Sequence, residues 1–184
     1  SQMGPVKGVA PEFFGTTPDN DVYADNIEPQ GLKGTACTIH LPDGSQFDCV
    51  VPVPGIHMVS NALAGASVGY ALELTPDEIK AGIEGLPSIP GRNHIIKTDK
   101  IIVLDDCYNA NPVSMKASLK VLGDALGRKV AILGDMGELG ENEVALHESV
   151  GEFAGTCRID RLVCVGRLSR HLMDKAKDTN PALE

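Results

Sequence analysis

Short apolar runs alternate with helix-like stretches through the second half of the chain, and this alternation constrains the fold more than any other feature. The runs have the length of strands, and the stretches between them carry apolar residues at helical spacing. The predicted strands are 101–104, 129–133 and 161–165, and the predicted helices are 112–126, 142–154 and 168–177. Strands joined through helices of this length make right-handed crossovers, so we predict an α/β fold with a mostly parallel sheet and flanking helices.

Two of these predicted strands end in polar blocks. Asp105–Pro112 (DDCYNANP) follows the apolar run Ile101–Leu104, which we interpret as a buried strand, and Leu133–Gly140 (LGDMGELG) closes the next strand. Open α/β sheets bind their ligands at the carboxyl ends of their strands. A core has no need of clustered carboxylates, amides and an aromatic hydroxyl, so we expect both blocks to face a ligand.

The first half of the chain has a different pattern. Alternating runs at 35–41 and 47–51 flank a Pro-Asp-Gly-Ser turn and predict a β-hairpin. The small residues of 61–71 predict a closely packed helix, and Thr75–Glu78 (TPDE) is a capping box that begins another. A hairpin followed by helices is expected to form a lobe of its own.

Two prolines and a glycine within 87–92 (PSIPGR) predict the boundary between the lobes. A chain of 184 residues is long enough for one sizeable core or two small ones. We therefore divide it into lobes at 1–88 and 89–184.

Charge and hydropathy argue against two kinds of partner, nucleic acid and a membrane. The 16 Lys and Arg residues against 25 Asp and Glu leave a net charge of -9, with no basic stripe, so we expect no nucleic-acid partner. No apolar stretch approaches the roughly 20 residues that cross a bilayer, so we expect no membrane insertion.

The five cysteines are odd in number and widely spaced, without CxxC or zinc-ligand spacing. Reduced thiols in a cytosolic protein are expected. Cys37 and Cys49 lie on the two arms of the predicted hairpin, where they could approach each other. A turn at Asp43-Gly44 would place them one residue out of register, so we predict no disulfide.

In the first polar block, Asn111 is placed as an N-cap with Pro112 at the first helical position, so the free N–H groups of the helix attract anions. On its own, Asn111 is explained as a cap and Asp106 as a turn residue. Adjacent carboxylates at Asp105 and Asp106 are harder to explain unless hydroxyls, an ammonium or a cation lie nearby.

The second polar block is not a dinucleotide fingerprint. Its glycines are spaced GxxGxxG rather than GxGxxG, and its two acidic residues would repel a pyrophosphate. Those carboxylates suit a substrate ammonium better. Taken alone, Glu138 would be a solvated loop acid, and His147, within a predicted helix, a surface or packing histidine.

Three further polar residues are candidates. Arg92 follows Gly91 in the boundary segment and could reach a phosphate, although loop arginines are commonly just exposed. His57 and Asn61 stand one helical turn apart on one face, and no third ligand accompanies them, so we predict no metal site. The chain also lacks GxxxxGK[ST], the usual triphosphate-binding loop.

Five segments together resemble the Mur ligase family in order and spacing, and the likeness runs from about Phe14 onward. They are GIHMVSNALAGA (55–66), PGR (90–92), DDCYNANPVSM (105–115), LGDMGELG (133–140) and HESVG (147–151). The resemblance implies that 1–88 is the last part of the family's central ATP-binding domain. It implies that 89–184 is a Rossmann-like C-terminal domain, incomplete at its C-terminus. One departure is Met58, where the family usually has Asn.

Within the family, the YNANP and GDMGELG blocks point to ligases that add D-alanyl-D-alanine to UDP-N-acetylmuramoyl-tripeptide for bacterial cell-wall synthesis. The resemblance implies a cytoplasmic enzyme that uses ATP and Mg²⁺ and works through an acyl phosphate. Because the P-loop is absent, the 184-residue chain alone is expected to be inactive.

Two alternatives to this function remain. One is a related Mur or folylpolyglutamate-type ligase with another acceptor, and the other is a non-enzymatic nucleotide-binding module. The glycine spacing argues against a third, an NAD-dependent oxidoreductase.

The resemblance also implies roles for individual residues. Asn61 is expected at the adenine of ATP, Arg92 at the phosphates and Asp106 at the ribose hydroxyls. The residues expected to face the cleft are His57, Tyr108, Asn109 and Asn111. Those expected near the dipeptide ammonium are Asp135, Glu138 and His147.

Overall fold

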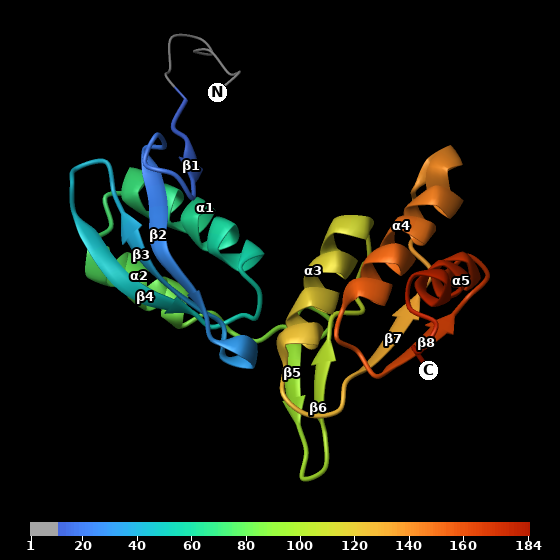
Figure 1. The fold of residues 1–184 in the computed structure, drawn as a ribbon. Helices are drawn as coiled ribbons and strands as arrows, with labels where there is room; N and C mark the ends of the chain where they lie inside the picture. Colours follow the sequence, from blue (N-terminus) through green and yellow to red (C-terminus); the bar gives the residue numbers. More distant parts are fainter. Residues whose placement is uncertain (1–10) are drawn as a thin grey trace. The chain divides into compact units, whose positions relative to one another are not determined.

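A computed structural model describes residues 11–184, which divide into two compact units, one ending at Pro87 and the other beginning at Ser88 (Figure 1). The division lies inside the PSIPGR segment (87–92), one residue before the boundary predicted between 88 and 89. Each unit has its own cluster of buried apolar side chains. Within residues 11–184, no helix is long and apolar enough to cross a membrane.

The first unit is a four-stranded sheet with two helices packed on it (Figure 1). The strands lie in the order β1-β2-β3-β4, with β1 parallel to β2 and the other neighbours antiparallel. The elements are β1 (Phe14–Gly15), β2 (Val22–Pro29), the 3-10 turn η1 (Gly31–Lys33), β3 (Thr35–His40), β4 (Gln46–Val51), α1 (His57–Ala71) and α2 (Pro76–Glu84). The predicted hairpin is therefore β3–β4, and both predicted helices are present.

The turn between β3 and β4 sets a register that differs from the prediction. Leu41 N donates to Ser45 O at 2.9 Å and Gly44 N to Leu41 O at 3.0 Å, so the loop holds the three residues 42–44. Gly44 has a φ of +83°, the left-handed conformation that such a loop requires. The additional loop residue places Cys37 directly opposite Cys49, and the predicted offset of one residue was wrong.

The helices of the first unit begin and pack as their sequences indicate. At the start of α2, Thr75 Oγ1 accepts from Glu78 N, and Glu78 Oε2 accepts from Thr75 N at 2.8 Å, which completes the predicted capping box. The small residues of α1 permit a close approach of α2. A Cβ added to Gly69 would lie 3.0 Å from the side chain of Ile79.

The second unit alternates strands and helices, which confirms the α/β class. Its elements are β5 (His94–Lys97), β6 (Ile102–Asp105), α3 (Pro112–Asp124), β7 (Val130–Gly134), the 3-10 turn η2 (Gly140–Asn142), α4 (Glu143–Thr156), β8 (Arg161–Val165) and α5 (Ser169–Thr179). β7 and β8 pair in parallel, as a helical crossover requires. β5 and β6 pair antiparallel, so the described strands of this unit form two separate ladders.

The strand expected to be buried at 101–104 is largely exposed. Ile101, Ile102 and Val103 expose 59%, 54% and 38% of their surface. Among the described strands β6 pairs only with β5, and a two-stranded ribbon leaves much of its surface uncovered. The prediction of a buried strand was wrong because an apolar run does not reveal which element covers it.

Candidate functional site

Two adjacent carboxylates hold the turn that carries Arg92. Asp105, the last residue of β6, accepts a hydrogen bond from Gly91 N at 3.0 Å, and Asp106 accepts one from Asn93 N at 3.1 Å. Gly91 and Asn93 both have positive φ, +77° and +49°. The turn is therefore fixed on either side of Arg92, and this explains why two carboxylates stand together at the strand end.

Asp106 also joins this turn to α3. Its second oxygen accepts a hydrogen bond from Ser118 Oγ at 2.6 Å. An ionised carboxylate offers about four acceptor positions, so two further donors can still be accommodated. Asp106 is partly buried and held on both sides, and it can accept hydrogen bonds from a pair of neighbouring hydroxyls.

Asp105, the acid next to Asp106, is held in its charged form. The Cys107 thiol and the Gly91 backbone N–H donate to Asp105, which places the pKa of the Asp105 carboxyl below its ordinary value of 3.8. The same contact raises the pKa of the Cys107 thiol. Asp105 is thus a carboxylate, and Cys107 a thiol, at neutral pH.

Arg92 lies over the ring of Tyr108. The centre of its guanidinium is 4.1 Å from the ring centroid, and Tyr108 N donates to Gly91 O at 3.0 Å. A cation over an aromatic face is attracted by the ring quadrupole. Both side chains are exposed, so the ring orients the guanidinium without removing it from solvent.

The loop after β6 ends in a fully formed helix cap. Asn111 Oδ1 accepts from Val113 N and Ser114 N, both at 2.9 Å, and Ser114 Oγ accepts from Asn111 N at 3.1 Å. Asn109 is exposed, and its Oδ1 accepts from Ala110 N at 2.9 Å. The amide oxygen of Asn111 therefore serves as the cap considered for it from sequence.

Asp135, which directly follows β7, holds the loop between β8 and α5. Its carboxylate accepts from Arg167 N at 3.0 Å, and from Ser169 N and Ser169 Oγ, both at 2.7 Å. Desolvation would raise the pKa of this carboxyl, but the bonds from Ser169 and its neighbours outweigh it, and the pKa lies below 3.8. Asp135 thus joins the GDMGELG loop to the start of α5.

His147 is completely buried on α4. Its Nε2 accepts from Met136 N at 3.0 Å, and its Nδ1 lies 2.7 Å from Glu143 O. Because a carbonyl oxygen only accepts, Nδ1 carries the proton and the ring is neutral. Through these two hydrogen bonds, His147 joins the GDMGELG loop to α4 inside the core, and none of its surface is exposed to solvent.

Glu138 lies at the exposed tip of the same loop with a φ of +58°. A positive φ is uncommon for a residue other than glycine, and such residues cluster at functional sites. Of the three residues predicted near a dipeptide ammonium, Asp135 and Glu138 are both exposed and His147 is buried. Asp135 and His147 make the hydrogen bonds that hold the loop in place.

His57 and Asn61 belong to the first unit. Both are exposed on the first turns of α1, one helical turn apart, as predicted. Asn61 Nδ2 donates to Met58 Sδ at 3.4 Å, so the methionine that departs from the family pattern contacts the residue expected at the adenine.

Sequence reasoning missed the residues that hold the candidate site although they are distant from it in sequence. Asn93, Ser118 and Ser169 each donate to one of its carboxylates, and Ser169 lies 34 positions from Asp135. No local pattern marks them. Within residues 11–184, no group of three or more His, Cys, Asp or Glu side chains could hold a metal ion.

Comparison with known proteins gives concordant matches. A family profile described as "Mur ligase, glutamate ligase domain" matches residues 91–182. The UDP-N-acetylmuramoyl-tripeptide–D-alanyl-D-alanine ligase of Escherichia coli K12 is 40% identical over 158 residues, which cover 85% of this chain and 34% of the relative.

Solved structures agree. MurF from Acinetobacter baumannii superposes with a TM-score of 0.81 at 31% identity, covering 93% of this chain and 36% of that one. MurF from Thermotoga maritima, in complex with ADP, shares the fold with a TM-score of 0.73 at 24% identity, covering 88% of this chain and 37% of that one. The chain spans about a third of the length of the relatives it matches.

Proposed function

The chain belongs to the Mur ligase family, and we propose that it is part of an ATP-dependent ligase that joins D-alanyl-D-alanine to UDP-N-acetylmuramoyl-tripeptide. The observation that carries this proposal is the likeness to the Escherichia coli ligase over most of the chain. The parent protein is proposed to act in the bacterial cytoplasm. Residues 1–88 are assigned to its central ATP-binding domain, and 89–184 to its C-terminal domain.

We assign the DDCYNANP block and the turn before it to the nucleotide. Arg92, oriented by Tyr108, is suited to binding phosphate oxygens, which guanidinium groups bind with paired hydrogen bonds. Asp106 keeps acceptor positions for two ribose hydroxyls. Asn61 is assigned to the adenine. His57 in the first unit, and Tyr108, Asn109 and Asn111 in the second, are assigned to surfaces that face the substrates.

We assign the GDMGELG block to the dipeptide. Glu138 would attract the D-alanyl-D-alanine ammonium, while Asp135 and His147 act through the loop that they hold. An exposed carboxylate attracts an ammonium before reaction, and the amine must then lose a proton in order to attack. This division fits the difference between the two acids, because Glu138 has a positive φ and Asp135 accepts hydrogen bonds from the start of α5.

The reaction requires control of charge around a phosphoryl group. The tripeptide carboxylate attacks the γ-phosphorus of ATP, ADP leaves, and the acyl phosphate forms. The neutral amine of the dipeptide attacks the acyl carbon, and the tetrahedral intermediate expels phosphate to give the amide. Arg92 would offset negative charge in the first step. Mg²⁺ would neutralise phosphate charge as well, and no residue of this chain is assigned to it.

The experiment uses the full-length parent protein. With ATP, UDP-N-acetylmuramoyl-tripeptide and D-alanyl-D-alanine, we expect one ADP per amide formed, detected as the pentapeptide product by mass spectrometry. Glutamate and single D-alanine serve as competing acceptors. Preferential use of either would identify a related ligase, and binding of ATP without amide formation would identify a non-enzymatic module. The 184-residue chain, which lacks GxxxxGK[ST], is expected to form no product.

A further inference from the structure

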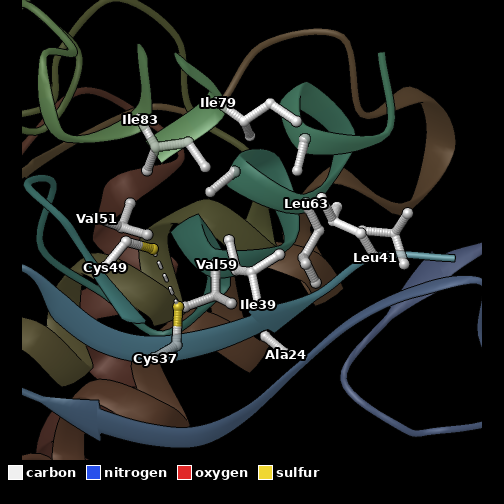
Figure 2. Close-up of a cluster of buried hydrophobic side chains, with 13 residues drawn as sticks. Ala24, Cys37, Ile39, Leu41, Cys49, Val51, Val59, Leu63, Ile79 and Ile83 are labelled. Atoms are coloured by element: carbon white, nitrogen blue, oxygen red, sulfur yellow. Dashed lines mark hydrogen bonds between the residues drawn. The ribbon is translucent and has the colours of Figure 1, made fainter. Parts of the chain in front are cut away.

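Two buried cysteines of the first unit face each other across the β3–β4 ladder. Cys37 lies directly opposite Cys49, and their sulfur atoms are 3.8 Å apart (Figure 2). Each residue exposes 4% of its surface. Both are free thiols, so the pair is a dithiol held in place by the sheet register.

The backbone at this pair already suits a disulfide. Residues directly opposite in an antiparallel ladder have Cα atoms about 4.5–5.5 Å apart, within the range of about 4.4–6.8 Å that disulfides span. The sulfur atoms need only side-chain rotation to approach bonding distance, which is about 2.05 Å. No rearrangement of β3 or β4 is required.

The buried pair also lies against a surface hollow. Cys37 and Cys49 line an open surface hollow of about 530 Å³, together with Asp48 of β4 and with Lys80 and Glu84 of α2. The charged residues that line the hollow are Glu28, Asp48, Glu84 and Lys80, so acids outnumber the one lysine. A small neutral oxidant is therefore favoured over an anionic one such as oxidised glutathione.

A hydrogen bond joins the two sulfur atoms, and either can be the donor. Burial raises the pKa of both thiols, whereas the hydrogen bond lowers the pKa of the thiol that accepts it. The accepting thiol is therefore the one that ionises first and attacks, and the donor resolves the intermediate.

We propose that Cys37 and Cys49 form a modification site that small neutral oxidants, such as an uncharged organic disulfide or hydrogen peroxide, convert to a disulfide joining β3 to β4. With a disulfide, the thiolate of one cysteine attacks one sulfur of the reagent and expels a thiolate. The other thiol then loses its proton, attacks the mixed disulfide and expels the second thiolate. Two electrons and two protons pass from the cysteines to the reagent, which leaves as two thiols.

Oxidation would alter the packing of α1. Cys37 and Cys49 belong to the same buried cluster as Val59 and Leu63, which lie on the helix that carries His57 and Asn61 (Figure 2). Drawing the sulfur atoms together changes the packing beneath that helix. The site nevertheless stands on its own geometry and does not depend on nucleotide binding.

The experiment equilibrates the 184-residue chain with buffers of 2-hydroxyethyl disulfide and 2-mercaptoethanol, followed by alkylation and tryptic digestion. Cys37 and Cys49 fall in one tryptic peptide, 34–80, that contains no other cysteine, whereas Cys107, Cys157 and Cys164 fall in three others. We expect peptide 34–80 to lose two hydrogens and resist alkylation. The other three should carry only alkyl groups or single mixed disulfides.

The same measurement in urea provides the reference state. Because the folded chain holds the thiols together, the equilibrium constant for the disulfide should be at least tenfold larger in the folded chain than in the unfolded one. Cys37→Ala should abolish the bond, and Cys157→Ala, a matched change at another cysteine, should leave it intact. An equal or smaller constant in the folded chain would overturn the proposal, and this comparison needs no variant that folds.

Discussion

Replacing His147 by phenylalanine tests how the interior positions the GDMGELG loop. Phenylalanine has nearly the same shape but cannot accept from Met136 N or donate to Glu143 O. A buried N–H left without a partner costs about 1–3 kcal/mol, and the loss of the second bond costs about 1 kcal/mol more. We therefore expect His147→Phe to lower the free energy of unfolding of the second unit by about 2–4 kcal/mol.

The assay is native-state hydrogen exchange of the 184-residue chain, because the two units need not unfold together. The most protected amides of β7 and α4 report the second unit, and those of β3 provide an internal control that should not change. His147→Gln is the matched variant, because its amide oxygen reaches the position of Nε2 and can accept from Met136 N. It should lose about half as much stability as His147→Phe. Equal losses in both variants, or a His147→Phe protein within about 0.5 kcal/mol of wild type, would refute the assigned role.

Three further predictions concern the site. In the full-length protein, Tyr108→Ala should raise KM for ATP about two- to fivefold while Tyr108→Phe leaves it unchanged, because the ring attraction on Arg92 corresponds to about 0.5–1 kcal/mol; equal effects of both changes on steady-state kinetics would contradict this. The folded-state pKa of Asp135 lies below 3.8, so its stabilising effect is complete above the unfolded value and is lost as pH falls through the folded one. Acid unfolding followed by circular dichroism should accordingly show less loss of stability below about pH 4 in Asp135→Asn than in wild type, and identical pH slopes would show that the carboxylate contributes nothing. Gly166→Ala should cost about 2 kcal/mol or more in urea unfolding, because φ is +125° and a Cβ would overlap the Asp135 carboxylate; an unchanged midpoint would rule out that constraint.

Local sequence signals predicted the elements well because their causes are local. The capping box at Thr75 and the cap at Asn111 each involve residues within three positions, and both are present. The alternation of strands and helices likewise predicted the parallel β7–β8 pair. The hairpin register failed because one more loop residue, invisible to a pattern of alternation, shifts every pair on the ladder.

The roles of site residues were harder to predict because their causes are distant in sequence. Asp135 and Glu138 look alike as loop acids, but Asp135 is hydrogen-bonded to Ser169 and Glu138 has a positive φ. His147 could not be distinguished from a surface histidine until Met136 was placed against it. The apolar run at 101–104 carried no information about which element would cover it.

Hydrogen exchange of the full-length protein with and without its ligands tests the central claim most directly. The account predicts that ATP slows exchange in peptides that contain 91–93 and 105–112. It predicts that D-alanyl-D-alanine, added with ATP and the UDP-tripeptide, further slows exchange in the peptide that contains 134–140. Protection by ATP confined to other parts of the protein, or no effect of the dipeptide on 134–140, would contradict the assignment of these two blocks to nucleotide and dipeptide.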